Sequence, residues 1–474
     1  MPHPDLMVVP VDADALAPRP VTLRGWGGGA GAFGWVVRPD RASQMAAAVD
    51  LYRSRAGGPG AWTGLIARGM GRSYGDAAQL EGGLTLETLR LKGFELDPQS
   101  GVLEAGAGVT IGELLAHVVP AGWMVPVVPG TQHVSVGGAI AGDIHGKNHG
   151  TAGTFGSHVA SLTLLLSNGE VVEVTPSPGP EIGLFEATLG GMGLTGVILA
   201  ARLRLAPVSS PFLSVDSDRV RDLDHALAAL EQTGGSYRVA WLDLLGSRPG
   251  RGIVTRAAHH PGFEASSRAH GAATVKAKAM VPERWPEGVL RTSAVRAFNE
   301  LRYRRAPARE RGRVESIGRH MFPLDGLDAW PRLYGRHGLL QYQLVVPHGS
   351  EQVLSAVIAE LCRARIPCYL AVLKDFGPSN GAPLSFPIAG WTLALDLPRA
   401  APGIAAVLDR CDELVAQAGG RVYLSKDARL RPDALRAMYP RLEEWRAARD
   451  GADPEMVWRS DLGVRTGLVP AARR

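Results

Sequence analysis

The sequence predicts an α+β fold in two domains, and two patterns along the chain support this prediction. From about Val21 to Val208, short apolar runs are broken by glycine turns, and few segments have a helical period. From Ser209 onward, longer helical patterns alternate with apolar strands. Antiparallel strands with separate helices are typical of α+β domains. With 474 residues and 45% hydrophobic composition, the chain is long enough for two or three cores.

The first half contains one clear helix signal and one clear hairpin signal. Thr110 and Glu113 have the spacing of a capping box, so we expect a helix from Thr110 through Val118. The runs LTLLL and VVEV flank Ser167-Asn168-Gly169-Glu170, and Asn-Gly predicts a type I′ turn between two strands. The later run GVILAARLRLAPV alternates as a strand does.

In the second half, helical patterns cover Leu223 to Leu230 and Val353 to Cys362, and the runs LQYQLVV and WTLALDL are expected to be strands. The segment from about Ala272 to Gly312 is basic and weakly periodic, so we expect a mobile loop or loosely packed helices there.

Composition excludes several classes of protein. The three cysteines, Cys362, Cys368 and Cys411, lack CxxC spacing and are expected to be reduced and structural. The N-terminus has prolines and acids where a signal peptide needs a basic start and an apolar core. No stretch reaches roughly 18 uninterrupted apolar residues. We therefore expect a cytoplasmic protein, or one that is peripheral at the membrane.

The net charge of +5 is modest, but seven arginines crowd one stretch. Such a run is usually a solvated loop; the alternative is a surface that meets anionic lipid or a phosphate-bearing substrate. Nucleic acid is not expected, because no aromatic stacking pattern or known binding module accompanies the charge. The seven are Arg302, Arg304, Arg305, Arg309, Arg311, Arg313 and Arg319.

Two glycine-rich segments predict a site for a large dinucleotide. In the first, residues 67–76 (ARGMGRSYGD), successive N–H groups can form a nest for a pyrophosphate. In the second, residues 129–150, small residues such as Gly137 and Gly138 leave room for a flat ring system. A bulky residue at Gly137 or Gly138 is therefore expected to prevent cofactor binding.

Two further patterns are set aside. Residues 191–196 satisfy GxGxxG, but a helical pattern precedes them and a strand pattern follows, the reverse of a Rossmann fingerprint. His145 and His149 are four residues apart, but neighbouring glycines disfavour a helix and no HExxH glutamate is present, so no metal site is expected.

At these residues the chain resembles the FAD-binding oxidoreductases of the vanillyl-alcohol oxidase type, which share a PCMH-type FAD-binding domain. ARGMGRSYGDAAQ, GGAIAGDIHGKNHG, GLTG, LQYQ, APLSFPIAGW and KDAR carry the resemblance, which extends over nearly the whole chain. It implies a bipartite FAD-binding domain, residues 1–209 and 421–474, with a substrate domain, residues 210–420, inserted between its parts.

The resemblance also implies which residues bind FAD. Residues 67–77 and 135–138 are expected at the phosphates, residues 142–145 near the isoalloxazine, and Val197 and Tyr423 around them. Tyr74 stands where covalent members can carry a flavin-linking histidine, so non-covalent FAD is expected. The implied set is Ala67, Arg68, Gly69, Met70, Gly71, Arg72, Ser73, Tyr74, Gly75, Asp76, Ala77, Gly130, Ser135, Val136, Gly137, Gly138, Gly142, Asp143, Ile144, His145, Val197 and Tyr423.

Oxidation of an alcohol requires a group that accepts the hydroxyl proton and positive charge near the reduced flavin. Lys426 and His145 match family positions beside the flavin, and either could be the base. The positions that match the substrate pocket are Tyr74, Lys147, Gln341, Gln343, Lys374 and Thr392, with Lys147 or Lys374 suited to a phosphate.

Within this superfamily the chain is most similar to oxidases of polyprenylphosphoryl-ribose, which serve cell-wall arabinan synthesis. The resemblance implies oxidation of a 2′-hydroxyl to a ketone, followed by a separate NADH-dependent keto-reductase that completes an epimerisation. Two departures are visible: Met321-Phe322-Pro323 replaces a tyrosine-histidine-proline run, and Ala394 replaces a cysteine that faces the flavin in many relatives. A soluble polyol or aldonolactone oxidase, or a non-catalytic membrane-surface component, are the alternatives.

Overall fold

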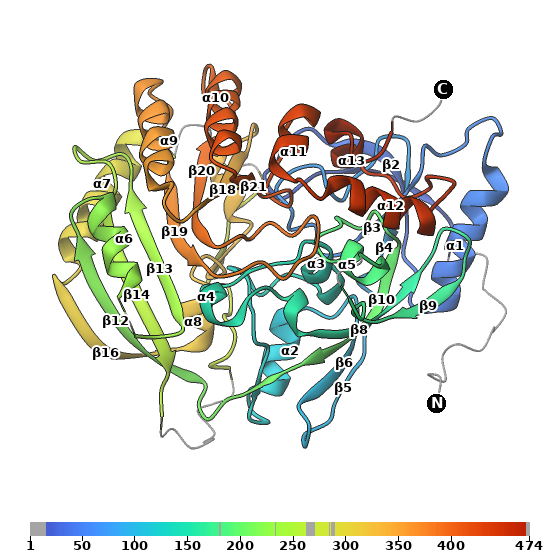
Figure 1. The fold of residues 1–474 in the computed structure, drawn as a ribbon, viewed down its shortest axis with the longest axis horizontal. Coiled ribbons are helices and arrows are strands. Elements are labelled where there is room, and N and C mark those ends of the chain that lie inside the picture. The colour runs from blue at the N-terminus through green and yellow to red at the C-terminus, as the bar shows by residue number, and fades with distance from the viewer. Residues whose placement is uncertain are drawn as a thin grey trace.

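The computed structural model describes residues 16–179, 182–232, 234–261, 271–283, 285 and 290–470, and it confirms the α+β prediction. Two small sheets belong to the first half of the chain (Figure 1). The four-stranded sheet has the order β1 (Arg19–Leu23), β2 (Ala32–Val37), β4 (Leu84–Glu87), β3 (Leu65–Arg68). The five-stranded sheet has the order β5 (Phe94–Leu96), β6 (Val102–Gly106), β10 (Val197–Arg204), β8 (Val159–Leu165), β9 (Val171–Val174).

An eight-stranded antiparallel sheet dominates the second half. Helices α6 (Leu223–Glu231), α9 (Glu351–Arg363) and α10 (Ile404–Gln417) share a hydrophobic core with this sheet. Its strand order is β16 (Arg309–Ser316), β12 (Phe212–Val220), β14 (Arg251–His259), β13 (Tyr237–Asp243), β19 (Leu370–Phe376), β20 (Gly390–Pro398), β18 (Leu339–Pro347), β21 (Arg421–Val422).

After β21 the chain returns to the first half. Helices α11 (Pro432–Met438), α12 (Leu442–Ala452) and α13 (Asp461–Thr466) lie near β2, β3 and β4 in Figure 1, and Trp458 bridges to Leu65 of β3. The expected domain boundaries at 209 and 420 fall between β11 (Ala206–Pro207) and β12 and between α10 and β21. The division into domains stays a prediction, and residues 1–15 and 471–474 lie outside the described residues.

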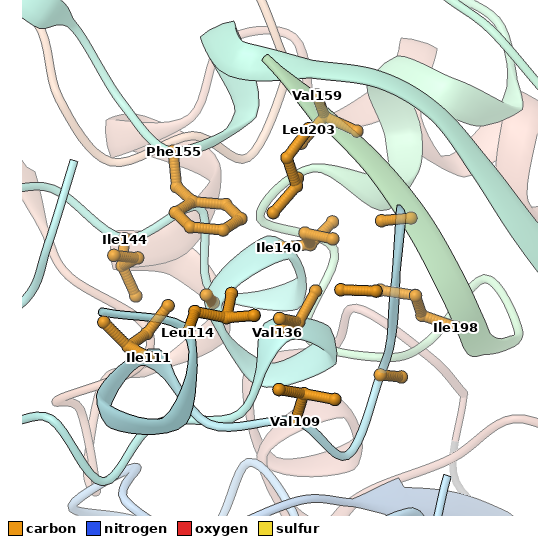
Figure 2. Packing of buried hydrophobic residues seen from close by; sticks show 14 of the residues in the cluster. Val109, Ile111, Leu114, Val136, Ile140, Ile144, Phe155, Val159, Ile198 and Leu203 are labelled. Carbon is orange, nitrogen blue, oxygen red and sulfur yellow. The ribbon is translucent and has the colours of Figure 1, made fainter. Parts of the chain in front are cut away.

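The core beneath the glycine-rich segments forms where two short helices meet the five-stranded sheet. Helix α2 (Ile111–Val118) contributes Ile111 and Leu114, and α3 (Val136–Ala141) contributes Val136 and Ile140. Figure 2 shows these side chains gathered with those of β8 and β10 around Ile140. Because α3 is packed on a sheet, Gly138 on its other side has a fixed position. The remaining elements are α1 (Ala42–Arg55), β7 (Trp123–Met124), α4 (His149–Ala152), α5 (Leu184–Thr188), β15 (Ala279–Met280), α7 (Thr292–Arg305), α8 (Ile317–Met321), β17 (Leu327–Asp328) and the 3-10 helices η3 (Gly156–His158) and η5 (Trp330–Tyr334).

Several local predictions are confirmed. The side chain of Thr110 accepts from the Glu113 N–H at 3.2 Å, and the Glu113 carboxylate accepts from the Thr110 N–H at 2.7 Å, which completes the capping box. The GxGxxG segment lies between α5 and β10, a helix before it and a strand after it. The four helices and strands expected in the second half are present as α6, α9, β18 and β20.

Two local predictions are wrong, and the first concerns the hairpin between β8 and β9. There Gly169 has φ +87° but Asn168 does not have positive φ. The Gly169 N–H donates to Leu166 O, and the Leu166 N–H donates to Glu170 O, so the turn is a three-residue loop with a glycine bulge. A type I′ turn would need positive φ at both central residues.

The second wrong prediction is that the arginine-rich stretch is a solvated loop. Arg302, Arg304 and Arg305 end helix α7, and Arg309, Arg311 and Arg313 belong to strand β16 at the edge of the large sheet. The segment from Ala272 to Gly312, expected to be a mobile loop or loosely packed helices, contains helix α7, and its residues 284 and 286–289 lie outside the described residues. In the part of the chain that the structure describes, no helix is long and apolar enough to cross a membrane.

Candidate active site

A cavity of about 580 Å³ lies between the glycine-rich segments and the large sheet. Figure 1 places α3 near the middle of the molecule, beside α5. One wall consists of residues from the two glycine-rich segments and the GxGxxG segment, and the other of side chains from β13, β14, β18, β19 and β20. The C-terminal return adds Tyr423, Ser425 and Lys426.

The two glycine-rich segments touch each other at this wall. A Cβ atom on Gly69 would lie 2.2 Å from Ser135 Oγ, so only glycine permits this contact. Ser135 in turn caps α3, because its hydroxyl accepts from the Gly138 N–H at 3.3 Å. Nearby the wall is open, since a Cβ on Gly130 would meet no atom of the described residues within 4 Å. Gly69 and Gly130, which are far apart in the chain, thus border one space.

Most of the predicted cofactor residues line the cavity. Those that do are Ala67, Gly69, Met70, Gly71, Arg72, Ser73, Tyr74, Ala77, Gly130, Ser135, Gly137, Gly138, Gly142, Ile144, His145 and Tyr423. Of the predicted substrate residues, Tyr74, Lys147, Gln341, Gln343 and Lys374 line it, and so do Lys426, Met321 and Ala394.

Four predicted cofactor residues have their side chains elsewhere. Arg68 donates to Ala78 O and Arg24 O and so braces its own loop. Both carboxylate oxygens of Asp76 accept from Arg465 of α13, at 2.7 and 2.9 Å. Val136 and Val197 are fully buried in the hydrophobic core. These residues support the wall from behind.

Three further residues also lie behind the wall. Gly75 packs so closely on the C-terminal return that a Cβ would lie 1.8 Å from Asp427 O. Asp143, at φ +37°, accepts from the Gly156 N–H, Asn380 and Ser385. Thr392 is buried and its hydroxyl accepts from Gln343 Nε2 at 3.1 Å, so it orients Gln343.

Three half-buried lysines line the cavity: Lys147 of the second glycine-rich segment, Lys374 of β19 and Lys426 of the C-terminal return. Burial lowers the pKa of Lys426 to about 8 against the opposing charge of Asp396. Burial, with the like charges of Lys426 and Lys147, lowers the pKa of Lys374 to about 7. Burial also lowers the pKa of Lys147 to about 8, with Glu315 opposing. Near neutral pH these amines can therefore exchange protons or carry charge with little change in free energy.

His145 lies in an aromatic enclosure. Its ring centroid is 4.8 Å from that of Phe376 and 5.1 Å from that of Tyr423, and its Nε2 is 3.0 Å from Gln343 Nε2. Burial and the positive charges of Lys374, His149 and Lys426 hold the pKa of His145 well below its usual value. The ring is thus neutral and Nε2 accepts from the Gln343 amide, while Nδ1 is buried without a partner among the described residues.

Sequence reasoning missed Asp396, which lies beside Lys426 and accepts from Gln341 Nε2 at 2.6 Å. Asp396 is two residues beyond Ala394 on a predicted strand, so both side chains lie on one face of that strand. This alternation could have identified Asp396 as a residue of the site. Sequence reasoning also missed Trp26, whose ring stacks under the Arg72 guanidinium at 3.7 Å. Met192, Gly193 and Gly196 line the cavity although their segment is no Rossmann fingerprint.

These features fit FAD. The cavity passes from the glycine-rich segments to the lysines, and its wall carries glycines where side chains would protrude. The buried His145 Nδ1, which has no partner among the described residues, and the half-buried lysines can bind polar or anionic groups.

The comparisons with known proteins agree with this geometry. Residues 34–175 match the family model of an FAD binding domain. Over 457 residues the chain is 37% identical to the decaprenylphosphoryl-β-D-ribose oxidase of Mycolicibacterium smegmatis, covering 94% of this chain and 97% of that protein. The chain belongs to the decaprenylphosphoryl-β-D-ribose oxidase family. As a member of this family, it is an FAD-dependent oxidoreductase.

Two further relatives show how far the similarity extends. An uncharacterized protein of Streptomyces coelicolor is 40% identical over 374 residues, 76% of this chain and 100% of that protein. The D-lactate dehydrogenase of Archaeoglobus fulgidus is 28% identical over 176 residues, 36% of this chain and 38% of that protein. The decaprenylphosphoryl-β-D-ribose oxidase family thus matches nearly the whole chain, substrate side included, whereas the dehydrogenase matches little more than a third of it.

Proposed function

We propose that this enzyme oxidises the 2′-hydroxyl of a polyprenylphosphoryl-β-D-ribose to the 2′-keto sugar. The observation that carries the proposal is the set of three half-buried lysines in the cavity, Lys147, Lys374 and Lys426, which suits a sugar at one end and a phosphate at the other. When bound, FAD supplies the acceptor for the hydride that leaves the carbinol carbon.

The sugar end of the cavity is at Lys426, His145, Gln341 and Gln343. The two glutamines are fixed by Asp396 and by Thr392, at 2.6 and 3.1 Å, so their amides can orient ribose hydroxyls. Lys426 accepts the hydroxyl proton in this proposal, because a lysine with a pKa of about 8 is partly neutral near physiological pH. Burial and the neighbouring positive charges lower the pKa of His145, so in this proposal it serves as a neutral group beside the flavin ring.

The phosphate end is at Lys147. Its ammonium donates to the His320 carbonyl, and Arg313 and Arg319 line the same part of the cavity. Arg319 is 78% exposed, so this end is near solvent. A phosphodiester there leaves the polyprenyl chain directed out of the enzyme.

The cofactor is held without a covalent bond in this proposal, since Tyr74 provides no imidazole for a histidyl linkage. The ketone is then the substrate of a separate NADH-dependent reductase. The GxGxxG segment of this chain has a helix before it and a strand after it, the reverse of the fingerprint that binds a nicotinamide dinucleotide. We also place the enzyme peripherally at the membrane that holds its substrate.

The test is an anaerobic mixing experiment. Adding a polyprenylphosphoryl-ribose should bleach the flavin absorbance of the purified enzyme within seconds, and acid precipitation should release the flavin into the supernatant. If simple polyols bleach the flavin faster and yield hydrogen peroxide in air, the enzyme is a polyol oxidase instead. A colourless protein that cannot be loaded with FAD would remove the enzymatic proposal altogether.

A further inference from the structure

Helix α7 presents its large apolar side chains to solvent and not to the protein. Phe298 is 60% exposed and Leu301 is 47% exposed, whereas the buried residues of the helix are Val295 and Asn299. At about 100° per residue, Phe298 and Leu301 share one stripe with exposed Ala294 and Ala297, roughly 130° away from the buried face. This is the opposite of the amphipathic pattern by which a surface helix buries its apolar side.

Polar contacts hold the helix in this orientation. Asn299 Nδ2 donates to the buried Asp243 carboxylate at 2.9 Å, and Glu300 accepts from Arg251 at 2.5 Å. The Arg302 guanidinium lies 4.5 Å from the ring centroid of Trp241. Because these contacts attach the helix to β13 and β14, the apolar stripe is fixed on the outside.

The charge of α7 is strongly positive. Its fourteen residues include four arginines and one glutamate. Around the helix axis, Arg302 and Arg304 lie about 80° to either side of the apolar stripe. Arg305 lies at the C-terminal end of the stripe. An apolar stripe flanked by arginines is the pattern of a helix that lies in a membrane interface, and clustered arginines are attracted to anionic lipid headgroups.

The stripe adjoins the mouth of the active-site cavity. Arg302 of α7 and Arg313 of β16 both line that cavity. The chain passes from α7 to the edge strand β16 through residues 306–308, and on β16 Val314 is a further exposed apolar side chain, 45% exposed. Figure 1 places α7 and β16 at the same end of the molecule, far from β2.

We propose that α7 docks the enzyme on an anionic bilayer, with Phe298 and Leu301 inserted among the headgroups and the arginines on lipid phosphates. A protein partner is a poorer occupant, since stable interfaces bury about 800 Å² per partner and this stripe offers only two large apolar side chains among the described residues. The inference deepens the proposed function, because a docked α7 places the cavity mouth where a polyprenyl substrate is held. Binding to vesicles can nevertheless be measured without any substrate.

The experiment is flotation of the FAD-loaded enzyme with vesicles of phosphatidylglycerol and phosphatidylcholine. The parent should bind mixed vesicles and release them as salt rises, because exposed charges are screened over about 8 Å at physiological ionic strength. The double variant Phe298→Ser/Leu301→Ser should bind about tenfold or more weakly, since each substitution removes an apolar side chain from the interface. Phe33→Ser is the matched control: Phe33 is also 47% exposed but belongs to β2, and its variant should bind as the parent does.

A second measurement separates this inference from the proposed function. Flavin bleaching is compared for a long-chain substrate in vesicles and for a short-chain, water-soluble phosphoribose. The double variant should lose bleaching only with the vesicle-held substrate. Equal vesicle binding by parent and double variant, or no binding by the parent, would overturn the inference while soluble-substrate bleaching still tests the reaction. If the parent ignores vesicles but self-associates through residues 298 and 301, the face is a protein interface and the inference is wrong.

Discussion

Lys426 is subject to two opposing influences on its charge. Burial disfavours the ammonium form, while the nearby Asp396 carboxylate favours it, and the resulting pKa is about 8. Its Nζ lies 4.1 Å from the ring centroid of Tyr74, a cation–π arrangement that fixes its position. Lys426 can therefore either supply a fixed positive charge or accept a proton. The variants Lys426→Arg and Asp396→Asn distinguish these two roles.

We expect Lys426→Arg to retain FAD but lose most flavin reduction, at least about a hundredfold, as expected for loss of a proton-transfer group. An arginine keeps the positive charge but cannot deprotonate near neutral pH. In the parent, the rate of anaerobic reduction should rise with pH through about 8, because the neutral amine is then the major form. Stopped-flow reduction within about twofold of the parent for Lys426→Arg would limit Lys426 to an electrostatic role.

Asp396→Asn tests the same assignment through the pH profile. The Asp396 carboxylate raises the pKa of Lys426, so its removal should lower that pKa and move the rising limb of the profile to lower pH. A structural defect alone would reduce the rate without moving the limb. His145→Ala serves as the comparison, because His145 is the other candidate base. Loss of reduction in that variant alone would transfer the role to His145.

At the residue level, the sequence predicted most of the cavity wall but not which side of each segment faces it. Gly137 and Gly138 line the cavity, whereas the side chain of Asp76, which was expected at the cofactor, binds Arg465, 389 positions away. Nothing in the sequence near Asp76 reveals such a distant partner. Thr392 and Asp396 share one face of β20, so the alternation along the strand could have identified Asp396 beside Thr392.

At the level of elements, α3 shows that adjacent glycines have different functions. A Cβ on Gly137 would lie 3.0 Å from the Ala107 Cβ, so it would strike the core and not the cofactor space. Among the described residues, a Cβ on Gly138 meets only Ser135 Oγ, at 3.2 Å, and Val134 Cγ1 at 4.0 Å. The expectation that both positions exclude FAD by direct obstruction is therefore corrected for Gly137.

We expect Gly137→Leu to destabilise the fold by about 1–3 kcal/mol, the usual cost of overpacking. Gly138→Leu should instead leave the melting temperature of the FAD-free protein nearly unchanged while its FAD affinity falls about tenfold or more. Flavin titration and thermal unfolding of both FAD-free variants provide the comparison. If Gly138→Leu binds FAD as the parent does, this side of α3 does not contact the cofactor.

Elements with strong local signals were predictable. Thr110 and Glu113 start α2 because both partners of the capping box lie within one turn. The Asn168-Gly169 turn was assigned the wrong type, because one glycine at positive φ serves either a two-residue or a three-residue loop. Helix α7 was expected only as one of two alternatives, a mobile loop or loosely packed helices, because its buried face is partly polar and its large apolar side chains are exposed, which removes the usual periodic signal.

For the whole molecule, Arg465 joins three distant parts of the chain. It pairs with Asp76 of the first glycine-rich segment at 2.7 Å and with Asp427 of the C-terminal return at 2.9 Å, and it donates to Leu430 O. The Asp427 side chain is only 2% exposed. Removing Arg465 would leave a buried carboxylate without its cation, which is more costly than a lost surface pair.

We therefore expect Arg465→Ala to lower the free energy of unfolding by about 3 kcal/mol and to weaken FAD retention, because residues 67–77 lose their attachment to α13. Denaturant unfolding and the flavin-to-protein absorbance ratio measure the two effects. Arg431→Ala is a suitable control, since its pair with Asp433 is exposed on both sides. Equal stability of the two variants would show that the Arg465 cluster does not join the halves.

The short strand β21 gives the molecule a stiff connection at one end of the cavity. Its two residues pair with β18, Tyr423 then donates to Gly142 O at 2.7 Å, and the Tyr74 N–H donates to Ser425 O at 3.0 Å. Within a few residues, the return segment is thus bonded to the large sheet, to the end of α3 and to the first glycine-rich segment. The two halves cannot part here without breaking these bonds together. We therefore expect a bulky substrate to enter and its product to leave at the end of the cavity that Arg302 of α7 lines, because the end beside β21 is held together by these bonds.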